Sequence, residues 1–209
     1  MKATLIILAA LIIFSYGCGN NLNTKQETES HDMSKMDAKK NSIMESMETM
    51  NTKMMGIQMT NNPDKDFAGM MKIHHEGAIN MANIEMAEGK NNELLKMAAK
   101  IKQDQNAEII QFEKFLADTK DTSTREGFSM ELMESMKSMS NASHDMSANI
   151  DAQFVSMMIS HHQAAINMAK VYLKYANDKS LKAMAEQIVS SQQKEIEEMK
   201  LIKLYKYHL

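Results

Sequence analysis

Apolar side chains recur at spacings of three and four residues through most of the chain after residue 41, a pattern typical of helices packed on one face. The first such segment, residues 42–59, carries Met44, Met47, Met50 and Met54 on one face and predicts a short helix ending near Pro63. Two longer segments follow at about 64–118 and 151–204, each divided near its middle by a polar stretch that predicts a tight turn. We therefore expect an all-α fold.

The two long segments are copies of each other. The stretch FAGMMKIHHEGAINMA at 67–82 returns as FVSMMISHHQAAINMA at 154–169, and residues 64–116 align with 151–203 without a gap. The tetrapeptide Met-Glu-Ser-Met also occurs twice, at 44–47 and 133–136. Each copy predicts a helical hairpin, and two hairpins can close their apolar faces on each other. We expect a duplicated helical hairpin that forms an antiparallel four-helix bundle with short extra Met-rich helices.

The start of the chain has a different pattern. One Lys precedes an apolar run from Leu5 to Phe14, which small residues separate from Cys18. This order is typical of a secretory signal, and the run is shorter than the roughly 20 residues of a spanning helix. Because Ser15-Tyr16-Gly17-Cys18 resembles a bacterial lipobox, although Ser and Tyr depart from its usual residues, we expect a signal peptide over 1–17 and a lipid on Cys18. The alternative is a secreted protein in which Cys18 is removed or idle.

The remaining N-terminal residues are polar. Residues 18–40 contain almost no large aliphatic side chains, so they cannot bury enough apolar surface to order themselves, and we expect a flexible tether. The duplicated bundle is then expected over 41–209. A net charge of -3 gives no basic surface for nucleic acid, and a single Cys excludes a disulfide framework.

Methionine is the compositional outlier, with 24 residues in 209 and no Trp, since Met is not among the common residues of average proteins. On an ideal helix the side chains of Met70, Met71 and Met81 lie within about 60° of His74, so this His falls inside a methionine stripe. His75 lies about 100° round the helix and flanks the stripe. The second copy repeats the arrangement with Met157, Met158, His161, His162 and Met168.

Thioether and imidazole together indicate a soft metal. Sulfur ligands favour Cu(I), and by the same softness Ag(I), while imidazole also suits copper. Zinc sites rarely use Met, and calcium and magnesium prefer oxygen. The alternative is a core in which Met fills irregular gaps and each His is hydrogen-bonded, although a core chosen for volume alone would favour Leu or Ile.

Two further groups of residues extend this hypothesis. The tetrapeptide His-Asp-Met-Ser occurs at 31–34 and 144–147, where His31 with Met33 and His144 with Met146 are candidate accessory ligands for metal capture. Coincidence, or simple packing of short helices, is the alternative. On the second helix of each hairpin, i and i+3 residues share a face and are candidates to hold the other N–H of a ligand imidazole; these are Gln105, Glu108, Gln192 and Glu195. Both Glu residues could instead be solvated or paired with Lys.

Catalytic motifs are missing from the sequence. The di-iron pattern needs Glu-x-x-His, but residues 71 and 158 are Met. The stretch His75-Glu76-Gly77-Ala78-Ile79 has no second His at the metalloprotease spacing. We therefore expect no enzymatic activity, with a metal-dependent oxidoreductase as the remaining catalytic alternative.

The motif Phe67-x-x-Met-Met-x-x-His-His-x-x-Ala-Ile-x-Met-Ala, its second copy, and Gln105-x-x-Glu108-Ile109 resemble the domain-of-unknown-function 305 family over roughly 64–204. The resemblance implies an exported, ferritin-like helical protein, and some members of the family are associated with copper. It implies metal ligands among Met70, Met71, His74, His75, Met81, Met157, Met158, His161, His162 and Met168. The chain departs from the family at Phe115-Leu116, where members often carry Trp, which affects packing more than metal binding.

These observations together predict a lipoprotein of the bacterial cell envelope, periplasmic or on the outer surface. We expect it to bind copper(I) and silver(I) for buffering, storage or tolerance, with copper-transfer proteins as its partners. The alternative is a structural or partner-binding lipoprotein whose Met-rich faces are docking surfaces.

Overall fold

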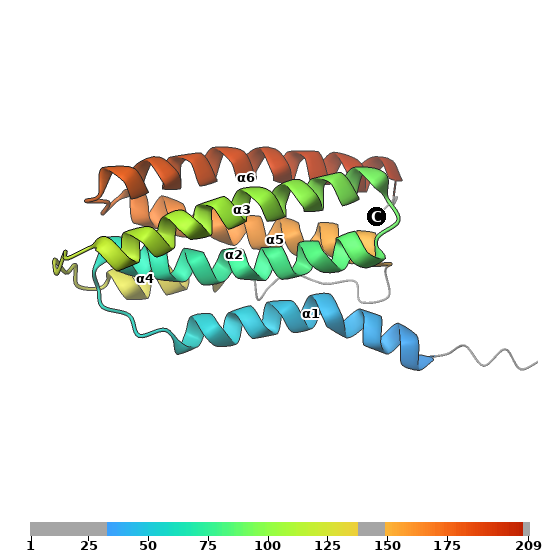
Figure 1. Cartoon of the computed structure of the whole chain (residues 1–209), viewed down its shortest axis with the longest axis horizontal. Helices are drawn as coiled ribbons and strands as arrows, with labels where there is room; N and C mark the ends of the chain where they lie inside the picture. Colours follow the sequence, from blue (N-terminus) through green and yellow to red (C-terminus); the bar gives the residue numbers. More distant parts are fainter. Residues whose placement is uncertain (1–32, 138–148, 207–209) are drawn as a thin grey trace, which may run out of the picture. The chain divides into compact units, whose positions relative to one another are not determined.

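The computed structural model describes residues 33–137 and 149–206, and all regular structure in these ranges is helical (Figure 1). The helices are α1 (Met33–Gly56), α2 (Pro63–Glu88), α3 (Asn92–Asp118), α4 (Phe128–Glu134), α5 (Ile150–Leu173) and α6 (Lys179–Lys206). The expected all-α class is confirmed. The predicted signal peptide with Cys18, and the accessory residues His31, His144 and Met146, lie outside the described residues.

The helices carrying the His-His motifs lie at the centre. Helix α2 packs along α3, α5 packs along α6, and α2 and α5 pack on each other. Helix α1 packs on α2 and reaches α5, while α4 contacts both. In Figure 1, α3 and α6 run on one side of α2 and α5, and α1 runs on the other. The two hairpins α2–α3 and α5–α6 therefore form the expected bundle, and α1 and α4 are the extra Met-rich helices.

Local capping explains where the bundle helices begin. Asn62 accepts a hydrogen bond from the Lys65 amide at 2.8 Å, and Asn149 accepts one from the Ala152 amide at 3.0 Å, so each hairpin opens on an Asn N-cap. Asp64 and Asp151 are acidic residues in the first turns of α2 and α5. Pro63 follows the first cap, where its missing N–H is not needed.

Helix α1 differs from expectation at its start. It begins at Met33, so residues 33–40, expected within the flexible tether, belong to a helix. The Met, Ala and Lys residues of this stretch are good helix formers and extend the amphipathic segment upstream. The buried side of α1 takes Ile43 with Met47, Met50 and Met54, whereas Met44 is half-buried.

The absence of a side chain at Gly77 lets α1 pack close to α2. A Cβ atom added to Gly77 would lie 2.5 Å from Sδ of Met50, inside any tolerable contact distance. The buried Met50 side chain therefore packs directly on the α2 backbone one turn from His74. The equivalent residue of the second copy is Ala164. None of the described helices combines the length and apolar character needed to cross a bilayer.

Candidate metal centre

His74 and His161, the histidines inside the two methionine stripes, meet where α2 and α5 pack together. The ring centroids of His74 and His161 lie 3.6 Å apart with 38° between the ring planes. Nε2 of His161 lies 2.9 Å from the backbone oxygen of His74 and donates a hydrogen bond to it. Nδ1 of His161 is therefore an acceptor, and it has no partner in the described part of the chain. Neither ring nitrogen of His74 has one.

The two flanking histidines face the outer helices of their own hairpins. Nε2 of His75 donates to Oε2 of Glu108 at 2.7 Å, and Nε2 of His162 donates to Oε2 of Glu195 at 2.9 Å. Each carboxylate thereby fixes the proton on Nε2 and leaves Nδ1 as an acceptor. Both Nδ1 atoms are buried and lack a partner among the described residues. The geometry is the one in which a carboxylate orients a ligand imidazole.

The four imidazoles form a row through the centre of the bundle. Adjacent rings within a copy are separated by 6.5 Å for His74 and His75 and by 6.1 Å for His161 and His162, and the central pair is in contact. All four side chains are fully buried. The sequence placed His74 inside the methionine stripe and His75 beside it, and the structure shows why both positions are buried: α2 is covered by α5, α1 and α3.

Burial keeps the central pair uncharged. It holds the pKa of His74 well below the usual value, with further lowering from His161 and then His75 and His162. Burial also lowers the pKa of His161 strongly, and the neighbouring His162 and His75 add to this. Both imidazoles are therefore neutral at pH 7, which is the form that binds a metal ion.

The expected methionine residues are all part of the hydrophobic core. The buried set consists of Met70, Met71, Met81, Met157, Met158 and Met168. Within the described ranges, no three or more His, Cys, Asp or Glu side chains form a cluster that could hold a metal ion. A site with three or more ligands built from these residues would need other donor atoms, and methionine sulfur is the donor that the core supplies most abundantly.

The Gln residues expected to support the ligands are buried, and three of their four side-chain amide atoms have no hydrogen-bond partner in the described structure. Oε1 and Nε2 of Gln105, and Oε1 of Gln192, make no hydrogen bond within the described structure. Each lies three residues before the Glu that contacts a histidine, on the same face of its helix. Buried amide groups without partners are costly, by about 1–3 kcal/mol each, so these atoms mark a region that favours a polar or charged ligand.

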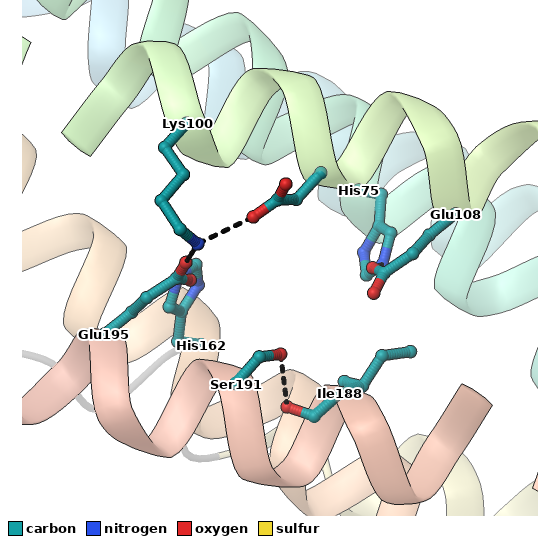
Figure 2. Close-up of polar contacts among 8 residues, drawn as sticks. His75, Lys100, Glu108, His162, Ile188, Ser191 and Glu195 are labelled. Atoms are coloured by element: carbon teal, nitrogen blue, oxygen red, sulfur yellow. Dashed lines mark hydrogen bonds and ion pairs between the residues drawn. The ribbon is translucent and has the colours of Figure 1, made fainter. Parts of the chain in front are cut away.

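Lys100 contacts the site but belongs to none of the sequence motifs described above. Its Nζ lies 2.9 Å from Oε1 of Glu195 and 2.7 Å from Oδ2 of Asp104. Figure 2 shows Lys100 extending from α3 toward Glu195, which also faces His162. Burial opposes ionisation of Glu195, but its hydrogen bonds with His162 and Lys100 outweigh this and hold its pKa below the usual value. Comparing the two copies would have drawn attention to Lys100, because its counterpart is Gln187.

Fold and site together define a duplicated helical bundle with a buried core of histidine and methionine. The chain belongs to the family described as Domain of unknown function (DUF305), whose model matches residues 19–116 and 116–203. The resemblance seen in the sequence is confirmed. Each match is longer than one hairpin, because the first includes α1 and the second includes α4.

The chain is also similar to solved structures of CopM. The apo form is 27% identical with a TM-score of 0.54, over 69% of this chain and 98% of that chain. A silver-bound form obtained by soaking is 27% identical with a TM-score of 0.54, over 72% and 99%. The Cu(I)-bound form is 26% identical with a TM-score of 0.52, over 70% and 97%. No curated protein sequence matches the chain.

Proposed function

We propose that this protein binds copper as Cu(I), and silver as Ag(I), at the centre of its bundle, and that it buffers or stores the metal without catalysis. The observation that carries the proposal is the row of four buried imidazoles, each with a ring nitrogen that has no partner in the described structure. The CopM structures with silver and with Cu(I) bound support it, because this chain shares their fold at 26–27% identity.

The chemistry of the donor atoms suits a soft monovalent ion. Cu(I) and Ag(I) accept thioether sulfur and neutral imidazole nitrogen, and the core supplies both. A neutral site also suits a single positive charge, since burying a more highly charged ion without carboxylate ligands is costly. The proposed ligands are the expected set: Met70, Met71, His74, His75, Met81, Met157, Met158, His161, His162 and Met168.

The hydrogen bonds indicate which atoms would bind the metal. His75, His161 and His162 each use Nε2 as a donor, to Glu108, to the backbone of His74 and to Glu195 respectively. The free lone pair is then on Nδ1 in all three rings. We expect coordination through Nδ1, with Glu108 and Glu195 acting as the partners that orient the flanking rings.

The alternative of a docking protein is less well supported by the position of the methionines. A Met-rich docking face must be exposed, but most methionines of α1, α2 and α5 whose burial the structure describes are buried. Among the described residues, the large exposed methionines are Met55, Met130 and Met133. These exposed thioethers are also suitable first contacts for an incoming ion.

The cellular setting belongs to the same proposal. The signal-like N-terminus supports export, and Cys18 is the proposed site of a lipid that anchors the protein in the cell envelope. His31, Met33, His144 and Met146 are proposed accessory ligands, and copper-transfer proteins are the proposed partners.

The test is titration of the purified full-length protein, kept in detergent, with Cu(I) under reducing conditions against a chelator of moderate affinity. We expect retained copper and a rise in melting temperature, because a ligand that binds only the folded state stabilises it. A variant with His74, His75, His161 and His162 changed to Leu should lose both effects.

A second measurement covers the case in which the Leu variant does not fold. Histidine 15N NMR of the unmodified protein, titrated with Ag(I), should shift the Nδ1 resonances of His75, His161 and His162 while their Nε2 resonances stay those of protonated nitrogen. An unmodified protein that retains no Cu(I) and shows no histidine response to Ag(I) would refute the proposal.

A further inference from the structure

The two halves of the bundle match closely at their histidines but not at the carboxylates behind them. Residues of the second copy follow those of the first at a constant offset of 87. Both His–Glu pairs span 33 residues and have nearly the same length, 2.7 Å in the first copy and 2.9 Å in the second. Of the two carboxylates, Glu195 contacts Lys100, and no lysine contacts Glu108 in the described part of the chain.

The difference has a clear origin in the sequence. The counterpart of Lys100 is Gln187, and the counterpart of its second partner, Asp104, is Ser191. The charged pair on α3 is thus replaced by two neutral residues on α6. Gln187 is exposed and bears no charge, so it gives Glu108 no cation where Lys100 gives one to Glu195.

The charge balance follows from these contacts. A carboxylate hydrogen-bonded to a ligand imidazole increases the electron density on the ring and contributes negative charge near the metal. In the second copy the ammonium of Lys100 offsets that charge directly at the buried Glu195 carboxylate. The other partner of Lys100, Asp104, is 50% exposed, so solvent screens its negative charge. In the first copy the charge of Glu108 is not offset by any described lysine. A cation is therefore held more strongly by the half that contains His75.

We propose that Lys100 makes the two halves of the metal centre unequal, so that the first Cu(I) or Ag(I) ion binds at His75 in the first copy and the His162 half fills afterwards. Lys100 is a positioning residue here, because it acts through Glu195. This inference rests on the proposed function. The side chain of Lys100 is 60% exposed, so solvent screens its charge. Surface ion pairs of this kind change affinities by about two- to fivefold, which is the expected ratio between the halves.

The experiment is a titration of 15N-histidine-labelled full-length protein with Ag(I) below one equivalent, in which the His75 and His162 resonances are followed separately. In the unmodified protein the His75 signals should respond first. Changing Lys100→Gln together with Asp104→Ser installs both residues found in the other copy and should make both histidines respond together. The double variant Lys100→Gln with Gln187→Lys moves the cation to the other half and should reverse the order.

The matched control is Lys96→Gln, which removes the same charge from an exposed position one turn earlier on α3. It should leave the order unchanged, and the melting temperature of each metal-free variant shows that the fold is kept. Simultaneous filling in the unmodified protein, or an order that ignores the Lys100 and Gln187 changes, would overturn the inference and leave the proposed function intact. A protein whose histidines ignore Ag(I) altogether would instead refute both.

Discussion

The hydroxyl group of Tyr172 donates a hydrogen bond of 2.6 Å to Oδ1 of Asp64, which joins the end of α5 to the start of α2. The same oxygen accepts the backbone amides of Asn177 and Asp178, in the turn between α5 and α6, at 3.2 and 3.3 Å. The first-turn acid of one hairpin thus holds the turn of the other hairpin. This contact ties the two copies together at one end of the bundle.

The equivalent contact from Asp151 to the first hairpin also uses two backbone amides, but a different side chain stands where Tyr172 does. Oδ1 of Asp151 accepts the amides of Lys90 and Asn91, in the turn between α2 and α3, at 2.8 and 3.2 Å. The residue that corresponds to Tyr172 is Glu85, whose side chain is fully buried. Burial first, and the adjacent Asp151 second, raise the pKa of Glu85 to about 8. A protonated Glu85 thus occupies the position of the phenol, but its carboxyl oxygens have no hydrogen-bond partner in the described structure.

The substitution Glu85→Gln tests this assignment through the pH dependence of stability. Because the folded protein holds a proton on Glu85 that the unfolded chain releases near pH 4.5, stability should fall as pH rises from about 4.5 to about 8. The slope due to one group is at most about 1.4 kcal/mol per pH unit. The Gln variant has no such proton, so its unfolding free energy, measured by urea denaturation, should lack this part of the decline.

Parallel curves for the two proteins over this pH range would show that Glu85 is ionised in the folded state. Tyr172, which holds the equivalent position in the second copy, is the comparison, because its phenol stays protonated at these pH values.

Removing the phenolic hydroxyl should weaken the first of the two contacts. Tyr172→Phe keeps the ring, which stacks on Phe67 with centroids 4.1 Å apart, and deletes only the donor to Asp64. The loss should be about 1–3 kcal/mol of unfolding free energy, since it leaves a buried carboxylate with one donor fewer. Thermal or urea unfolding measures it. A change below about 0.3 kcal/mol would mean that the turn amides alone satisfy Asp64.

The contact between α1 and α2 predicts a steric effect at Gly77. The variant Gly77→Ala places a methyl group against Met50 and should lower stability by about 1–3 kcal/mol, as overpacking does in well-packed cores. Gly56→Ala is the matched control, because nothing lies within 4 Å of the added methyl group there. Combining Gly77→Ala with Met50→Ala should cost less than the sum of the two single changes, because the clash is absent when Met50 is truncated. A Gly77→Ala protein as stable as the unmodified one would show that α1 does not pack this closely.

The lowered pKa values of the central histidines predict that bound metal resists mild acid. Protons compete with a metal for imidazole only below the pKa of the ring, and burial holds the pKa of His74 and His161 well below 6.5. We therefore expect Cu(I) to stay bound as pH falls from 7 to about 6, where a solvent-exposed imidazole with a pKa near 6.5 would be mostly protonated. Equilibrium dialysis at stepped pH measures this, and half-release near pH 6.5 would contradict it.

Much of this architecture follows from local sequence. Helix positions, the hairpin turns and the burial of His74 follow from periodicity, which records which face of a helix is apolar. The pairing of His75 with Glu108 can also be predicted from the sequence, because both residues lie in fixed register on two helices joined by a short turn. Periodicity and turn length are local properties, so one sequence is enough to predict them.

Contacts between the copies are not local. Periodicity cannot tell which helix faces another across the bundle, so it did not predict the contact of His74 with His161. The reach of Asp64 to the far turn, and of Lys100 across to α6, depends on the same tertiary packing. The start of α1 at Met33 was missed for a different reason: low hydrophobicity predicted a tether where helix propensity extends the helix.

The duplication also has a genetic consequence. A dimer of two identical hairpin chains would carry the same residue at both equivalent positions, so any mutation would act on both halves at once. In this chain the equivalent positions instead differ, with Glu85 in the first copy and Tyr172 in the second, and with Lys100 in the first and Gln187 in the second. Joining both halves in one gene therefore lets selection adjust each end of the bundle, and the surroundings of each histidine pair, independently of the other.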